Sequence, residues 1–85
     1  MLAFTDRARE ILRRSHEAAR RFNPDAAVRV SPGPDGEARF DLVDRPAEGD
    51  AVLEEEGFVL YVAPGVRGTV DVALPHDRLV LRPGP

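Results

Sequence analysis

The sequence predicts an α+β domain in which one N-terminal amphipathic helix packs on small, mostly antiparallel β-sheets of six to seven short strands. Three observations predict this class. The chain has 85 residues, enough for one hydrophobic core. Apolar residues at helical spacing occur once, near the N-terminus, and the chain from residue 24 onward alternates between short apolar segments and Pro/Gly turns. We therefore expect residues 1–85 to form a single domain.

The helix is predicted over residues 6–21. Thr5 has a typical N-cap side chain, and Asp6 follows where the helix dipole favours an anion. The positions expected to face the core recur at helical spacing, and they are Ala8, Ile11, Leu12, Ser15, Ala19 and Phe22. The opposite face carries two Glu-to-Arg pairs four residues apart, and Asn23-Pro24 ends the helix.

The predicted strands are short and bounded by turn-forming residues. They are expected at residues 2–4, 27–31, 37–43, 51–55, 58–63, 69–74 and 78–82. The segment 32–36 reads Pro-Gly-Pro-Asp-Gly and predicts a turn, because Pro fixes φ and Gly accepts positive φ. In the strand that follows this turn, Ala38, Phe40 and Leu42 share one face.

The composition excludes several kinds of chemistry. The chain has no Cys, which excludes disulfides, thiolate nucleophiles and cysteine-ligated metal centres. All twelve basic residues are Arg, so a lysine Schiff base is excluded as well. The serines lack a triad partner at readable spacing, and no glycine-rich phosphate loop precedes a helix. We predict that the chain is not an enzyme and binds no cofactor.

The formal net charge is −3, but it is unevenly distributed. Residues 1–22 hold six Arg and three acids, whereas residues 23–85 hold six Arg and twelve acids. An acidic chain is a poor candidate for nucleic acid or an anionic membrane, and no apolar run approaches the roughly 20 residues of a membrane helix. No targeting segment is visible at the N-terminus, so we expect a cytoplasmic protein that binds neither nucleic acid nor membrane.

The residues that could hold a metal ion do not have the spacing of metal ligands. His16 lies beside the apolar face of the predicted helix, and His76 lies in a Pro-His-Asp turn. Glu54, Glu55 and Glu56 form the densest acidic run, which is more typical of a solvated hairpin tip than of a cation site. No metal site is predicted.

Several segments follow one another in an order found in one known family. They read Leu-Ala-Phe-Thr-Asp-Arg-Ala at 2–8, Val-Asp-Arg-Pro at 43–46, Gly-Asp-Ala-Val at 49–52, Glu-Gly-Phe-Val-Leu-Tyr-Val at 56–62, Gly-Thr-Val-Asp-Val at 68–72 and Leu-Val-Leu-Arg-Pro-Gly-Pro at 79–85. In this order they resemble the HesB/IscA-like domains, the A-type iron–sulfur carriers. The resemblance spans nearly the whole chain and implies one HesB-like domain over residues 1–85, with the compact β-rich fold of that family.

The resemblance fails at the residues that bind the cluster. The family uses three cysteines, the first in a G-C-S-G turn and the other two in a C-G-C segment after the last strand. Here the turn reads Gly33-Pro34-Asp35-Gly36, with Pro34 in the place of the cysteine, and the sequence ends at Pro85 without a C-G-C. The resemblance therefore implies a degenerate A-type domain that does not bind a cluster.

A domain of this kind is expected to act by contact with a protein partner, with the link to iron–sulfur cluster biogenesis resting on analogy. The candidate partner surface combines the arginine row of the helix with the turn, and consists of Arg7, Arg14, Arg21, Pro34, Asp35 and Gly36. The arginines alone are more typical of a solvated, salt-bridged face than of a docking face for an acidic protein. A homo-oligomer is a further expectation, because a small core favours association.

Two other functions stay open. The chain could be a stand-alone structural or regulatory domain unrelated to iron–sulfur metabolism, sharing the fold by descent alone. It could instead be an atypical iron binder that uses His16, His76 and carboxylates.

Overall fold

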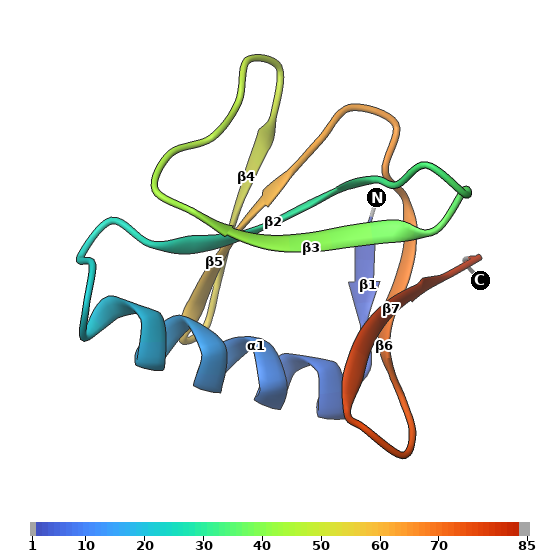
Figure 1. Ribbon diagram of the computed structural model, residues 1–85, viewed down its shortest axis with the longest axis horizontal. Helices are drawn as coiled ribbons and strands as arrows, with labels where there is room; N and C mark the ends of the chain where they lie inside the picture. The colour runs from blue at the N-terminus through green and yellow to red at the C-terminus, as the bar shows by residue number, and fades with distance from the viewer. Residues whose placement is uncertain (1, 84–85) are drawn as a thin grey trace.

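The computed structural model describes residues 2–83 and contains one helix and seven strands (Figure 1). In chain order these are β1 (Leu2–Phe4), α1 (Asp6–Arg20), β2 (Ala27–Pro32), β3 (Ala38–Val43), β4 (Ala51–Glu55), β5 (Phe58–Val62), β6 (Gly68–Ala73) and β7 (Arg78–Arg82). The predicted α+β class is confirmed. Every predicted element is present, with bounds that differ by at most one residue at either end.

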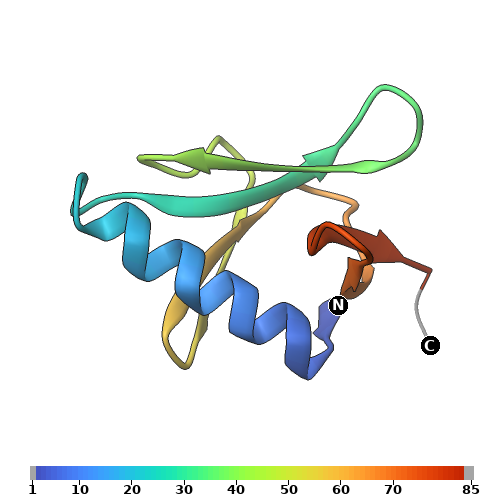
Figure 2. The same ribbon diagram turned by 60° about the horizontal axis from the view of Figure 1, so that its bottom comes forward.

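The strands form two sheets, one in the order β1-β6-β7 and the other in the order β3-β2-β5-β4. Three pairings are antiparallel, β2 with β3, β4 with β5 and β6 with β7. Two are parallel, β1 with β6 and β2 with β5. Each sheet is therefore mixed, although antiparallel pairs predominate as predicted. α1 lies along one side of the four-stranded sheet, with its N-terminal end near the three-stranded sheet (Figures 1 and 2).

The start of α1 is fixed by Thr5, as predicted. Its backbone is extended, with φ −76° and ψ 159°, and its hydroxyl accepts a hydrogen bond from the Ala8 amide at 3.2 Å. The same hydroxyl donates to Asp71 of β6 at 3.1 Å, while Arg82 of β7 donates to the other oxygen of Asp71 at 2.7 Å. The helix start is thereby tied to two strands. No helix within residues 2–83 is long and apolar enough to cross a membrane.

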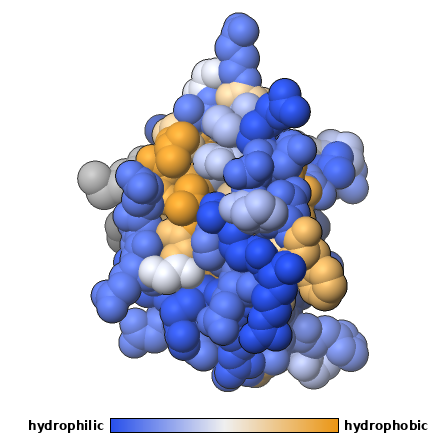
Figure 3. Space-filling model, turned by 90° about the vertical axis from the view of Figure 1, so that its left-hand side faces the viewer, coloured by the Kyte–Doolittle hydropathy of each residue, from blue (hydrophilic) through white to orange (hydrophobic). Residues whose placement is uncertain are grey.

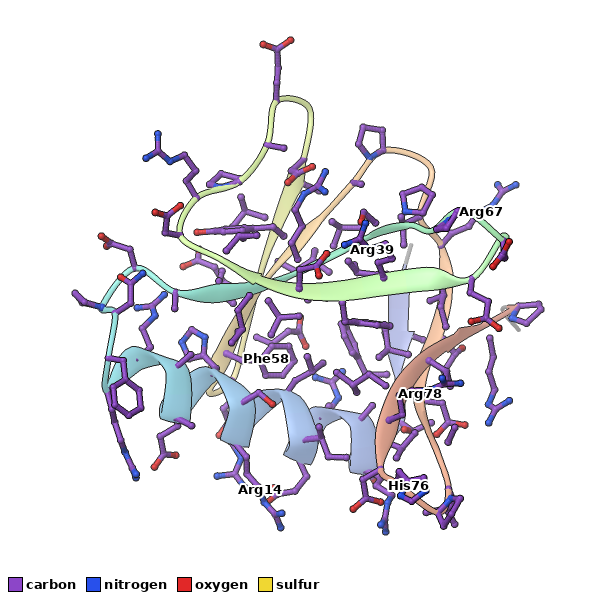
Figure 4. All side chains as sticks on the ribbon, viewed as in Figure 1. Arg14, Arg39, Phe58, Arg67, His76 and Arg78 are labelled. Carbon is purple, nitrogen blue, oxygen red and sulfur yellow. The ribbon has the colours of Figure 1, made fainter. Side chains whose placement is uncertain are left out.

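The core lies where α1 meets β2, β5 and β6. Its largest fully buried side chains come one from each of these elements, and they are Leu12, Val30, Leu60 and Val70. Phe58 lies between α1 and the four-stranded sheet (Figure 4) and meets Phe4 edge-to-face with ring centroids 5.8 Å apart. The apolar face of the helix and the inward positions of the strands thus form one cluster.

The prediction for Phe22 is wrong. The helix ends at Arg20, and the amides of Phe22 and Asn23 both donate to the carbonyl of Ala19, at 3.1 and 3.0 Å, which closes the last turn. Helical spacing holds only within the helix, so the Phe22 side chain does not follow the apolar face. It is 91% exposed.

The turn between β4 and β5 needs glycine at position 57, where φ is +88°. A Cβ placed there would lie 2.7 Å from Cδ of Arg13. We expect Gly57→Ala to lower the free energy of unfolding by about 1–2 kcal/mol, measured by urea denaturation. Gly65→Ala shares the cost of a positive φ, +84°, but its added Cβ meets no atom within 4 Å, so a larger loss in Gly57→Ala measures the contact with Arg13. Stability unchanged in Gly57→Ala would contradict this account of the turn.

Candidate functional site

A surface hollow of about 660 Å³ lies where α1, β3 and β7 border one another. Its apolar lining comes from all three elements and includes Ile11 of α1, Phe40 of β3 and Leu79 of β7, each partly exposed. Ser15 of α1 adds a hydroxyl. We call this feature the α1–β3–β7 hollow. It exists because α1 packs on β2, β5 and β6 and leaves the inner face of β3 partly uncovered.

Charged residues surround the hollow. Glu37 and Asp77 contribute carboxylates, and Arg78 and Arg82 contribute guanidinium groups. Asp77 accepts a hydrogen bond from Arg7 at 2.7 Å, which connects the start of α1 to the β6–β7 turn. The hollow therefore presents an apolar floor and a rim with both signs of charge.

The structure brings together only part of the predicted partner surface. Gly36 lines the α1–β3–β7 hollow, and Arg7 reaches its rim through Asp77. Arg14 points away from both sheets (Figure 4) and is paired with Glu10 at 3.2 Å. The remaining residues are all exposed: Pro34 and Asp35 lie in the same turn as Gly36, whereas Arg21 follows the other end of α1 and pairs with Glu17 at 3.7 Å.

The apolar residues of the hollow were not predicted as site residues. The sequence indicates that Ile11 and Phe40 face inward, but it gives no sign that α1 stops short of covering β3. The signal that could have found the hollow is the alternation of Arg78, Val80 and Arg82 with leucines, which marks β7 as a strand with one charged face.

A second hollow, of about 520 Å³, lies between the C-terminal end of α1 and β3. Phe22 and Leu42 line it, and these are 91% and 60% exposed. Figure 3 looks at this side of the molecule and shows separate apolar areas on a mostly hydrophilic surface. Two of the most exposed large apolar side chains therefore lie together at the end of β3.

The residues considered for a metal site lie on separate elements. His16 is on α1, His76 is in the turn before β7, and Glu54 and Glu55 are on β4. Glu55 is paired with Arg9 at 2.5 Å. Within residues 2–83, no three His, Asp or Glu side chains come together in a group that could hold a metal ion.

The imidazole of His16 on α1 is partly buried. Its Nδ1 atom is buried and has no hydrogen-bond partner among the described residues. Burial lowers the pKa of the imidazole, and the charge of Arg20 lowers it further. The folded protein therefore prefers the neutral form of this side chain.

The lowered pKa of His16 predicts that the free energy of unfolding decreases as the pH is lowered. Because its folded pKa is lower than its unfolded pKa, the contribution is fully present above about pH 6.5 and is lost as the pH falls through that value. We expect the free energy of unfolding, measured with urea, to decrease between about pH 7.5 and about pH 5 in the wild type. The decrease should be smaller in His16→Gln. The exposed His76 provides the control, and an equal reduction in His76→Gln would contradict the assignment.

Comparisons with known proteins show a structural likeness but no match to a family. No protein-family model matches the chain, and no curated protein matches it. Among solved structures, the chain is similar to one described as "Crystal Structure of IscA with the [2Fe-2S] cluster", with 25% sequence identity and a TM-score of 0.46. The alignment covers 87% of this chain and 77% of that chain.

Proposed function

We propose that this chain is a cysteine-free HesB/IscA-like domain that acts by binding another protein in iron–sulfur cluster biogenesis and carries no cluster itself. The observation that carries the protein-binding part is the α1–β3–β7 hollow, with its apolar floor inside a charged rim. Protein interfaces commonly combine a buried apolar centre with a polar border. The family assignment rests on the ordered segments of the sequence.

The rim of the hollow favours a partner segment with an apolar anchor next to a carboxylate. Ile11, Phe40 and Leu79 offer an apolar contact for the anchor. Arg78 is exposed on β7 and can donate two parallel hydrogen bonds to a carboxylate. Since Asp77 is already paired with Arg7, its charge repels such a carboxylate less than a free Asp would.

The absence of a cluster is proposed from the ligand chemistry. Pro34 stands where the family has its first cysteine, and a proline side chain has no atom that can bind iron. The chain contains no thiolate at any position. Iron–sulfur clusters are held mainly by cysteine thiolates, so the cargo chemistry of the family has no ligands here.

The first test is metal and acid-labile sulfide analysis of the untagged protein, before and after anaerobic reconstitution with iron and sulfide. We expect no bound iron and no charge-transfer absorption in the visible spectrum. Stoichiometric iron would contradict the cluster-free proposal and would point to His16, His76 and the acidic residues of β4.

The second test asks whether the hollow selects the partner. Wild-type protein and Arg78→Glu are used as baits in extracts of the source organism, and recovered proteins are identified and their affinities measured with purified components. We expect assembly proteins to be recovered by the wild type, and Arg78→Glu to weaken binding by roughly tenfold. Arg45→Glu makes the same charge change at an 83% exposed side chain outside the hollow and is the control.

The result that contradicts the proposal is recovery only of proteins unrelated to iron–sulfur assembly. It would favour a stand-alone structural or regulatory domain. Equal weakening by Arg78→Glu and Arg45→Glu would place the contact outside the hollow.

A further inference from the structure

Strand β3 has an unpaired edge. It pairs with β2 on one side, and among residues 2–83 no strand pairs with its other side. In Figure 2, β3 lies along the upper margin of the molecule, with the 33–37 turn beyond its beginning. An edge of this kind exposes backbone N–H and C=O groups that can pair with another chain.

The hydrogen-bond pattern shows which residues present these groups. Val30 of β2 accepts a hydrogen bond from the Ala63 amide at 3.0 Å, so its backbone polar groups point toward β5. Its register partner on β3 is Phe40. In an antiparallel pair, two directly opposed residues either both direct their backbone N–H and C=O groups at each other or both direct them away from each other. Because those of Val30 point away from β3, those of Phe40 point away from β2 and face the free edge.

The turn before β3 gives the direction of the backbone groups along the strand independently. The Gly33 amide donates to the carbonyl of Glu37 at 2.6 Å, which makes residues 33 and 37 a hydrogen-bonded pair. Counting along the strand from this pair, residues 39 and 41 point toward β2. Ala38, Phe40 and Leu42 therefore direct their backbone polar groups away from it.

We propose that β3 pairs antiparallel with β3 of a second copy of this chain, across a two-fold axis at Phe40. The strand reads Ala38-Arg39-Phe40-Asp41-Leu42 and is complementary to itself in this register. Arg39 lies opposite Asp41 of the second copy, and Asp41 lies opposite Arg39 of the second copy. Both side chains are exposed on the same face of β3, where they now approach each other at 3.6 Å.

The backbone groups match this register. Phe40 meets its own copy on the axis and the two residues exchange N–H···O bonds, while Ala38 pairs with Leu42 of the second copy. Opposite charges directly across two antiparallel strands stabilise the pair, and like charges destabilise it. The four-stranded sheets of two molecules would then form one continuous sheet.

The inner face of β3 also favours a second copy. Leu42 is 60% exposed and borders the second hollow together with Phe22, which is 91% exposed. Because Ala38 of the second copy lies opposite Leu42 in the proposed register, the neighbouring molecule removes part of this apolar surface from water. The inference stands on the edge of β3 and does not depend on the partner proposed above.

The test exploits the self-complementary charges. Sedimentation equilibrium from micromolar to millimolar concentrations is expected to show a reversible dimer for the wild type. Arg39→Asp and Asp41→Arg each place like charges opposite one another at two symmetric positions, and each is expected to raise the dimer dissociation constant about tenfold or more. The double variant R39D/D41R restores both pairs and is expected to restore the dimer.

Two further variants distinguish pairing at the β3 edge from effects of charge or of folding in general. Arg45→Asp makes the same charge change outside β3 and should leave the dimer unchanged. Leu42→Pro removes an N–H that faces the free edge while keeping the pairing with β2, so it should give a folded monomer by circular dichroism. A wild type that is monomeric at every concentration would overturn the inference, as would a dimer insensitive to the charge reversals or not restored by the double variant.

Discussion

Replacing Leu60 by alanine is expected to lower the free energy of unfolding by about 3 kcal/mol. Leu60 is fully buried on β5, the strand that pairs with β2 on one side and β4 on the other. Because β5 is held along both edges, the backbone cannot move in to fill the space left by the removed methyl groups. The loss then includes both the transfer of these groups and the cavity that remains.

The measurement is urea and thermal denaturation, with a melting temperature expected to fall by roughly 15 °C for a domain of this size. Leu74→Ala makes the same chemical change at a side chain that is 71% exposed, and we expect it to cost less than about 0.5 kcal/mol. Equal losses from the two substitutions would show that β5 is not the centre of the core.

Local features of the chain explain why the elements could be predicted. Turn residues bound most of the strands, and the Thr5 hydroxyl caps the helix just before its first turn, as its position in the sequence indicates. The inward positions of β3 follow from the period of a strand, and the register of Phe40 with Val30 confirms them. These features depend on residues that are close in sequence.

The pairing of distant strands could not be predicted in this way. β1 is parallel to β6, with Leu2 beside Gly68, and β2 is parallel to β5, with Val28 beside Leu60. Nothing in either local segment indicates its partner, because the choice depends on the packing of the whole core. The prediction for Phe22 was wrong for a related reason. Helical spacing places a residue on the apolar face only within the helix, and the helix ends at Arg20, before Phe22.

The candidate site was predictable only in part. A seven-residue repeat of arginines indicates a common helix face, yet Arg7 pairs with Asp77 seventy residues away while Arg14 pairs within the helix. The α1–β3–β7 hollow is made by three elements that meet only after folding. Its residue types, Ile, Phe and Leu, are those of any core, so composition could not distinguish them.

Asp50 makes the most buried ion pair among residues 2–83. Its side chain is 0% exposed and accepts hydrogen bonds from Nε and Nη2 of Arg29 at 2.8 and 2.9 Å, and from the Ala47 amide at 2.8 Å. β3 and β4 lie at opposite edges of their sheet, so residues 44–50 must cross β2 and β5 to connect them. The ion pair of Asp50 with Arg29 holds this connection against β2.

Asp50→Asn is therefore expected to destabilise the protein more than any substitution at an exposed ion pair. The amide keeps one acceptor oxygen but has no negative charge, so the guanidinium of Arg29, which is 24% exposed, loses one hydrogen bond and its counter-charge. Asp44→Asn is the matched control, because Asp44 pairs with Arg45 at 3.6 Å with both side chains more than half exposed. The readouts are the melting temperature and limited proteolysis within residues 44–50.

The pH dependence tests the charge itself. Arg29 holds the pKa of the Asp50 carboxyl below its usual range, chiefly through their hydrogen bonds. A carboxylate with a depressed folded pKa stabilises the protein above its unfolded pKa of about 3.9, and this contribution disappears as the pH falls through the folded pKa. The difference in stability between wild type and Asp50→Asn should then narrow as the pH falls below about 4. Asp71 also has a lowered pKa, caused first by Arg82, but it is present in both proteins and cancels in the comparison. A difference that stays constant over this range would show that shape at position 50, rather than charge, holds the crossing in place.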